Sequence, residues 1–339
     1  MFGESIMKLS ILDQSIVRQG SSAKEAIDET IETCKLAEEL GFNRFWVSEH
    51  HNAPSIAGSA PELLMVRLAG LTETIRIGSG GVMLPNHSAL KVAENFRLLE
   101  TLYPGRIDLG MGRAPGGDRI TASLLNPSNN FSEENYILQL EHLQRFFTDT
   151  AATNYGQLLA VPQAETIPQQ WILSSSGGSA KIAAEAGMGL VVARFINGHA
   201  DKRIVEMYKE NFKASEQMKK PAVMVAINVL CGETEQKAAN MRKLVDYRLL
   251  QFEKGDFGKP GKFEQIRTSE FSDKELGSIE NNKGRIVSGV KEVVKEQLIK
   301  IGKEFEADEI IVATMTDNFE DRKRSFELLS QVFELKNKN

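Results

Sequence analysis

Residues 41–51 read GFNRFWVSEHH and contain the unit from which the rest of the chain is built. Gly41 is a typical helix stop, and Arg44–Val47 is a short apolar run of the kind that forms buried strands. Four polar residues, 48–51, follow this run without a break. The segment therefore predicts the end of a helix, a buried strand and a polar loop, in that order.

Seven more aliphatic segments of this kind occur along the chain, and most intervals between them show helical apolar spacing. The first of these helices has both ends marked, by a predicted capping box of Ser22 with Glu25 and by the stop at Gly41. Strands that alternate with helices form parallel sheets, because a parallel neighbour needs a crossover connection. We therefore predict an α/β fold in which residues 1–339 form a single (β/α)8 TIM barrel. The predicted strands are Lys8–Leu12, Arg44–Val47, Ile75–Gly78, Ile107–Met111, Trp171–Leu173, Gly189–Val192, Val223–Val229 and Glu309–Ala313.

One stretch departs from the alternation. Residues 254–285 contain six glycines or prolines among many charges and few aliphatic side chains. We interpret them as a long insertion between strands seven and eight. Structureless segments of this length are usually mobile lids or disordered, and a lid at this position would cover the active-site face.

Composition excludes several classes of protein. The 339 residues are 41% hydrophobic and 26% charged, with a formal net charge of -5, which argues against a nucleic-acid partner. There is no apolar run of about 18 residues, and Met1–Ser5 lacks the basic-then-apolar order of a signal peptide. Cys34 and Cys231 lie in apolar stretches and predict buried thiols rather than a disulfide. We expect a cytoplasmic protein that does not span a membrane.

The turn at residues 174–179, SSSGGS, follows the fifth predicted strand and opens a helix. Its serine hydroxyls, the backbone N–H groups around Gly177 and Gly178, and the positive end of the helix dipole all favour a phosphate. Arg113, directly after the fourth strand, could supply a charge partner for the same phosphate. The alternative for the turn is an ordinary helix start with small packing residues. The alternative for Arg113 is a surface ion pair.

His50 and His51 follow the second strand. Adjacent residues of an extended strand end point to opposite sides, and no further His or Cys lies at ligand spacing, so we do not expect a metal site. A histidine at the mouth of a barrel strand can act as an acid or base near neutral pH. We predict that role for one of the pair, the alternative being a structural histidine.

Two glycine-rich stretches raise the question of a dinucleotide site. Residues 78–81 (GSGG) and 110–112 (GMG) both lie at the carboxyl ends of predicted strands. Neither fits G-x-G-x-x-G at the opening of a helix with an acidic residue about 20 positions on. A nicotinamide site is therefore the weaker interpretation.

Five segments together resemble the bacterial-luciferase-like flavin-dependent monooxygenases. The resemblance is specific because the Glu-His-His segment and the G-x-x-x-L-P segment occur in order, with strand spacing intact. The resembling segments are 41–51, Arg76–Pro85 (RIGSGGVMLP), Gly105–Arg113 (GRIDLGMGR), 174–179 and Asp308–Thr314.

The resemblance assigns roles to residues of this chain. His50 matches the catalytic histidine near the flavin, and Gly80 and Gly81 match a non-proline cis peptide beneath the isoalloxazine ring. Arg113 matches the phosphate arginine. Ser175, Ser176 and Ser179 match phosphate-contacting positions, and Gly177 and Gly178 complete that turn.

Two residues depart from the luciferase pattern. Gly112 stands where luciferase has a reactive cysteine, and Ser175 stands where luciferase has a glutamate. These departures, together with the pair of unlike subunits that luciferase needs, make light emission an unexpected activity for this chain.

The resemblance implies a reaction. Reduced FMN, supplied by a separate reductase, would react with O2 to a C4a-(hydro)peroxyflavin that oxidises an aldehyde or another small organic substrate. His50 would deliver or accept a proton, residues 254–285 would close over the intermediate, and the chain would form a homodimer. The alternatives are an F420-dependent hydride-transfer oxidoreductase on the same fold and a non-catalytic flavin-binding protein; His50 and the long insertion favour an enzyme.

Overall fold

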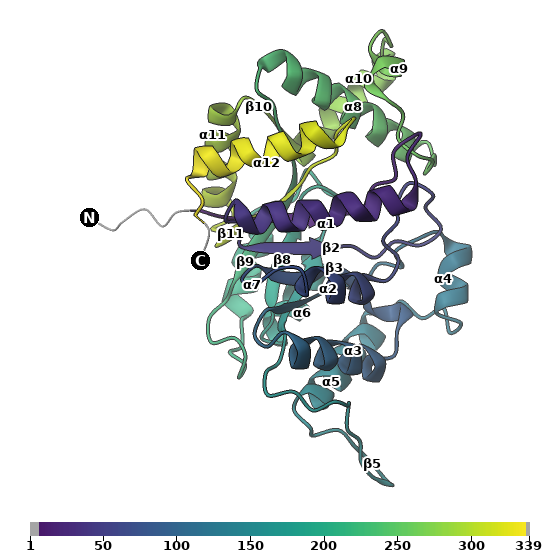
Figure 1. Cartoon of the computed structure of the whole chain (residues 1–339). Coiled ribbons are helices and arrows are strands. Elements are labelled where there is room, and N and C mark those ends of the chain that lie inside the picture. Colours follow the sequence, from purple (N-terminus) through teal and green to yellow (C-terminus); the bar gives the residue numbers. More distant parts are fainter. Residues whose placement is uncertain (1–6, 337–339) are drawn as a thin grey trace.

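In the computed structural model, which describes residues 7–336, eight parallel strands pair edge to edge and close into a barrel (Figure 1). The last strand pairs back with the first, from Lys8 opposite Glu309 to Ile11 opposite Val312. The predicted (β/α)8 TIM barrel is thus confirmed. Around the barrel the strands are β1 (Lys8–Asp13), β2 (Arg44–Val47), β3 (Arg76–Met83), β4 (Ile107–Gly112), β7 (Gln169–Ser174), β8 (Gly189–Ala193), β9 (Val223–Cys231) and β11 (Glu309–Ala313).

The third strand is longer than predicted. We expected it to end at Gly78, with Ser79 to Gly81 as a turn, but β3 continues to Met83. Its pairing with β4 also continues, to Met83 opposite Gly112, across a register shift between Gly80 and Val82. The glycines were misread as turn residues because glycine has no side chain to show the apolar pattern of a strand.

Helices cover the outside of the barrel. The predicted capping box at Ser22 and Glu25 starts the first of them, as expected. Two short strands outside the barrel, β5 (Ala152–Thr153) and β6 (Gly156–Gln157), form a projecting hairpin (Figure 1). The helices that follow barrel strands or precede them are α1 (Ala23–Glu39), α2 (Pro61–Ala69), α3 (Ala89–Leu102), α4 (Arg119–Leu125), α5 (Glu133–Phe147), α6 (Gly177–Glu185), α7 (Arg203–Asn211), α8 (Glu235–Glu253), α11 (Lys291–Glu304) and α12 (Phe319–Phe333), with a 3-10 turn η1 (Leu84–Asn86) after β3.

The insertion lies between β9 and β11, as predicted, but it is not structureless. It contains α9 (Phe263–Ile266), α10 (Asp273–Asn282) and the 3-10 turn η2 (Lys283–Arg285), followed by an extra strand, β10 (Ile286–Gly289), that pairs with β9. Ser272 and Glu275 form a capping box at the start of α10. Figure 1 shows α9 and α10 next to α8. The segment therefore has secondary structure of its own, and its mobility stays a prediction.

Two tryptophans fill the interior of the barrel. Trp46 of β2 and Trp171 of β7 are buried, with ring centroids 6.2 Å apart in an edge-to-face arrangement. Glycines on neighbouring strands make room for them: a Cβ at Gly78 would overlap the Trp46 ring, and a Cβ at Gly189 would overlap the Trp171 ring. These glycines therefore serve packing inside the barrel.

A buried ionic network closes the amino end of the barrel. Arg44 Nη1 donates to Asp108 Oδ2 at 2.8 Å, and Arg44 Nε lies 3.1 Å from Glu309 Oε2. Burial disfavours the charged form of Asp108, but Arg44 and Arg76 outweigh that effect and hold its pKa below the usual value. Because a buried charge is costly unless it is paired, we assign this network to the stability of the fold and not to catalysis. This is the role expected for residues at the amino end of a barrel.

The cysteine prediction is confirmed: Cys34 and Cys231 are buried and free. Within residues 7–336, no helix combines the length and apolarity needed to cross a membrane. The prediction made for Met1–Ser5 lies outside the described residues.

Candidate functional site

A cavity of about 310 Å³ lies at the carboxyl ends of the barrel strands. Six of the predicted site residues line it, brought together from four strand ends. They are His50, Gly80, Arg113, Ser175, Ser176 and Ser179; the lining is completed by Gln14, Met83, Gly112, Ala114, Leu173, Ala193, Phe195 and Ile196.

Three of the predicted residues are not part of this lining, namely Gly81, Gly177 and Gly178. The Gly80–Gly81 peptide bond is cis, which confirms the geometry expected there. Gly81 backs onto β4, since a Cβ at that position would lie 2.8 Å from the Gly110 carbonyl oxygen. Gly177 and Gly178 form the first turn of α6 and could reach the cavity through their backbone N–H groups only.

The loop after β2 holds His50 in one orientation. The backbone N–H of His50 donates to the Gly58 carbonyl at 3.0 Å, and its Nδ1 lies 3.1 Å from Ser48 Oγ. Burial lowers the pKa of His50 below its usual value. His50 is therefore neutral at pH 7, a state in which one ring nitrogen can accept a proton.

His51 has a different environment, because its ring is held by a buried carboxylate. Glu49 accepts hydrogen bonds from His51 Nε2 at 2.7 Å, from His87 Nε2 at 2.9 Å and from the Met83 backbone N–H at 2.9 Å. Burial opposes the ionised form of Glu49, but these donors outweigh it and lower its pKa. Of the two adjacent histidines, His50 is thus the one without a carboxylate partner. Within residues 7–336, no cluster of His, Cys, Asp and Glu is suited to a metal ion.

The start of α6 has free capacity for an anion. Its N-cap residue, Ser176, makes no side-chain cap hydrogen bond, so the first N–H groups of the helix are left for another acceptor. The Ser175 carbonyl is fixed by Asn197 Nδ2 at 2.8 Å, and Ser179 is buried at the cavity wall. Together with Arg113, these groups fit a phosphate such as that of FMN.

Arg113 is already paired. Its Nη1 lies 2.8 Å from Oε2 of Glu133, the first residue of α5, and both side chains are partly exposed. The ion pair considered for Arg113 from the sequence is therefore present, at the mouth of the candidate site. An anion that binds here meets both the guanidinium and the carboxylate.

A second cavity, of about 360 Å³, adjoins the first and shares Gln14 and His50 with it. Phe252 and Phe257 form part of its wall, with ring centroids 5.8 Å apart. Ser55 Oγ donates to the Phe257 carbonyl at 3.0 Å and joins the start of the insertion to the loop after β2. The remaining lining is His51, Asn52, Ala53, Ser55, Ile56, Gly116, Gly117 and Asp118.

The one carboxylate of this second cavity is already engaged. Asp118 is the N-cap of α4 and accepts from the backbone N–H groups of Ile120 and Thr121 and from Asn52 Nδ2. Its charge is thus compensated by the helix start. The cavity next to His50 consequently offers an apolar wall and no uncompensated charge.

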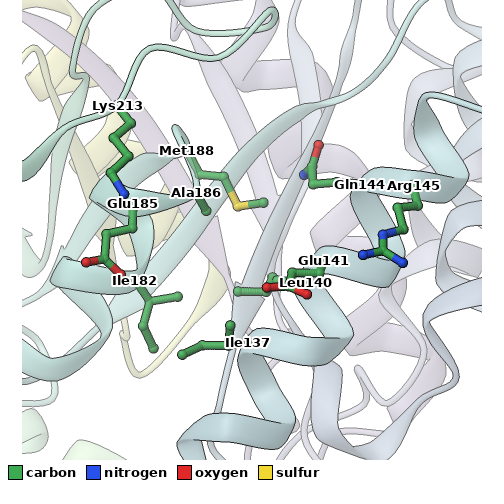
Figure 2. A pocket seen from close by; sticks show the side chains of 10 residues that line it. All are labelled: Ile137, Leu140, Glu141, Gln144, Arg145, Ile182, Glu185, Ala186, Met188 and Lys213. Atoms are coloured by element: carbon green, nitrogen blue, oxygen red, sulfur yellow. The ribbon is translucent and has the colours of Figure 1, made fainter. Parts of the chain in front are cut away.

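A third cavity, of about 460 Å³, lies outside the barrel between α5 and α6 (Figure 2). Ile137, Glu141 and Arg145 of α5 face Ile182 and Glu185 of α6 across it. None of the residues predicted from the sequence lines this cavity. It is therefore separate from the candidate site.

Several residues of the site were missed in the sequence. Gln14 comes directly after β1, so the strand-end rule that found His50 would have found it too. Glu133, Phe252 and Phe257 carried no such signal, because each lies on a helix or loop that approaches the site only in the folded chain.

Comparison with known proteins gives a family match over most of the chain. Residues 7–256 match the family model described as luciferase-like monooxygenase. The chain is 45% identical to the uncharacterized protein YwcH of Bacillus subtilis, over 97% of this chain and 99% of the relative. It is 34% identical to a luciferase-like monooxygenase of Escherichia coli (98% of each chain) and 36% identical to N-acetyl-S-alkylcysteine monooxygenase of Bacillus subtilis (96% and 98%).

Solved structures agree with this match. Apo-MsnO8 superposes with a TM-score of 0.91 at 31% identity, over 97% of this chain and 99% of MsnO8. The oxygenating constituent of 3,6-diketocamphane monooxygenase from Pseudomonas putida, in complex with FMN, has the same fold, with a TM-score of 0.72 at 17% identity over 98% and 99% of the two chains. An F420-dependent secondary alcohol dehydrogenase also has this fold, with a TM-score of 0.65 at 11% identity over 97% and 99%. This chain belongs to the luciferase-like monooxygenase family.

Proposed function

We propose that this protein is a flavin-dependent monooxygenase that uses reduced FMN and O2 to oxidise an aldehyde or another small organic molecule. The observation that carries the proposal is the convergence of His50, Arg113 and the uncapped start of α6 on one cavity. The FMN in the complex of the 3,6-diketocamphane enzyme, a protein of the same fold, supports this choice of cofactor.

The site residues fall into two groups, one for each end of the cofactor. Arg113, Ser175, Ser176 and Ser179 would hold the phosphate, with the N–H groups of Gly177 and Gly178. Gly80, Gly81 and Gly112 would leave a flat surface for the ring system. When bound, reduced FMN would supply the electrons that activate O2, while the protein supplies orientation and a dry environment.

His50 would move a proton. Its ring is neutral and held through Ser48, and it lies between the two cavities, which both include it in their lining. A neutral imidazole at this position can accept a proton from the substrate or return one.

The second cavity would hold the substrate. Its wall of Phe252, Phe257 and Ile56 suits an apolar group, and its common border with the first cavity at Gln14 and His50 would bring that group to the flavin. Residues 254–285, which contribute Phe257, would exclude water when they close.

The reduced flavin would come from a separate reductase. The 3,6-diketocamphane protein is named as the oxygenating constituent of its enzyme, which implies another component there, and we extend the same division of labour to this chain. We also propose a homodimer, argued below from the outer faces of α2 and α3.

The test is a titration with FMNH2 under argon, followed by admission of air with and without candidate aldehydes and thioethers. Saturable binding, flavin reoxidation slower than that of free FMNH2 and an oxygenated product would support the proposal. Binding without product for any substrate would favour a flavin carrier. No binding of FMNH2 with binding of reduced F420 would identify the hydride-transfer alternative.

A further inference from the structure

One carboxylate, that of Glu133, lies next to the groups that we assign to the phosphate of a flavin. Glu133 Oε2 lies 2.8 Å from Arg113 Nη1, and Arg113 lines the first cavity. The lining of that cavity contains no acidic residue of its own. Glu133 therefore reaches the site from the start of α5, outside the cavity wall.

The same oxygen atom also faces α6. A Cβ built on Gly178, the second residue of α6, would lie 3.7 Å from Glu133 Oε2. Because Ser176 leaves the first turn of α6 without a side-chain cap, the positive end of this helix attracts the carboxylate as it would attract a phosphate. Glu133 thus lies between the guanidinium and the helix start, the two groups that we assign to phosphate binding.

The Glu133 side chain can move away from Arg113. Glu133 is 51% exposed and Arg113 is 32% exposed, so the ion pair is screened by water and is weak compared with a buried pair. If Glu133 stayed in place, its charge would repel the phosphate. If it moved away, the Arg113 pair would be lost. Either way the carboxylate lowers the affinity for a phosphorylated ligand.

We infer that Glu133 competes with the flavin phosphate for Arg113 and the start of α6, and so sets how tightly this protein holds FMN relative to riboflavin. The inference rests on the proposed function for the identity of the flavin. A weakly held phosphate suits a protein that receives its flavin from another one and releases it after each turnover. Glu133 is then a specificity-determining residue for the phosphate end of the cofactor.

The experiment compares three proteins: the wild type, Glu133→Gln and the matched control Glu134→Gln. Glu134 is the next residue of the same first turn and is exposed, so its change removes the same charge from the same helix start. FMN and riboflavin are titrated into each protein, with flavin fluorescence as the readout. We expect Glu133→Gln to tighten FMN by about five- to tenfold, as expected for relief of repulsion between partly screened charges. Riboflavin affinity should stay unchanged, and Glu134→Gln should change neither.

Equal effects of Glu133→Gln on FMN and riboflavin would overturn the inference, because riboflavin has no phosphate. Weaker FMN binding would also overturn it, since Glu133 would then position Arg113 for the ligand. An equal effect of Glu134→Gln on FMN affinity would show that any negative charge at the start of α5 weakens binding, and it would also overturn the inference.

A second readout separates this inference from the proposed function. The rise in melting temperature with inorganic phosphate is measured for the same three proteins, without any flavin. A larger rise for Glu133→Gln than for the other two would support competition at an anion site even if no flavin bound. If FMN bound to all proteins but neither readout responded to Glu133→Gln, the inference would fall and the proposed function would stand.

Discussion

His50 is the residue on which the proposed chemistry depends most directly. Its pKa is lowered by burial, so the ring is already neutral at pH 7 and becomes protonated only below the usual histidine range. If the neutral ring accepts a proton during turnover, activity should be constant near neutral pH and fall only when the pH drops below the usual histidine range.

The variant His50→Ala should lower turnover by about 100-fold or more, the usual scale of acid–base catalysis, with FMNH2 affinity nearly unchanged. Stopped-flow turnover between pH 5 and 8 and an anaerobic FMNH2 titration provide the two measurements. Unchanged turnover in the variant would remove His50 from the mechanism.

At the scale of single residues, sequence reasoning works where position along a strand decides the role. His50, Arg113 and the serines of the 174–179 turn follow strands, and parallel strands bring their carboxyl ends together. The partner of Arg113 could not be predicted in this way. Glu133 begins a helix 20 residues later, and only the folded path of α4 and the following loop brings its carboxylate to the guanidinium.

Glycines in the barrel strands leave room for the large side chains of the interior. A methyl group at Gly78 would overlap the Trp46 ring and approach Asp108 Cβ to 2.7 Å. We expect Gly78→Ala to lower the free energy of unfolding by about 1–3 kcal/mol, the usual cost of overpacking a filled core. Urea unfolding followed by circular dichroism would measure the change.

The control for this change is Gly277→Ala. Gly277 lies inside α10, and a Cβ there would meet nothing within 4 Å. Because alanine is the better helix former, this variant should gain about 0.5–1 kcal/mol. Equal and small effects at the two positions would contradict the packing role of Gly78.

The insertion provides the next prediction. Phe257→Ala should raise KM for apolar substrates roughly five- to tenfold, the scale of one partly buried apolar contact, without changing FMNH2 affinity. Phe271→Ala is the matched control, because Phe271 belongs to the same insertion but not to the lining of either cavity. Steady-state kinetics with a series of substrates of increasing chain length would measure the change; equal KM values for all three proteins would exclude Phe257 from substrate binding.

The insertion also contains a helix that the sequence did not predict. Its place between β9 and β11 was predictable because two strands flank it, but α10 was not, since its sequence DKELGSIENN has only two large apolar residues. Such a helix has almost no apolar periodicity, and Leu276 is 49% exposed in the folded chain. The capping box of Ser272 and Glu275 was the one local signal, and the many glycines around it obscured that signal.

At the scale of the whole molecule, two neighbouring outer helices expose large aliphatic side chains. α2 and α3 pack against each other, and both expose large aliphatic side chains. Leu63 on α2 is 76% exposed, and Leu98 and Leu102 on α3 are 47% and 49% exposed. Because large exposed apolar patches mark protein–protein contacts, we predict that a homodimer, if it forms, uses the outer surface of α2 and α3.

The prediction is that Leu98→Glu shifts the protein from dimer to monomer, since a carboxylate buried in an apolar interface would have no partner. Sedimentation velocity over a range of concentrations gives the mass directly. Leu276→Glu, on the exposed side of α10, is the control and should keep the mass of the wild type. A monomeric wild type, or a dimer that survives Leu98→Glu, would contradict the assignment.

The pair of tryptophans inside the barrel has a consequence for optical work. The chain has two tryptophans in total, and both lie in the same buried cluster, so its tryptophan emission comes from the barrel interior alone. A shift of that emission to longer wavelength would report opening of the barrel, while the surrounding helices, which carry neither tryptophan, would contribute nothing to it. Flavins absorb near-ultraviolet light where tryptophan emits, so a flavin in the adjoining cavity would quench both residues by energy transfer. The wild-type protein thus carries an internal fluorescence probe for cofactor binding that needs no label and no substitution.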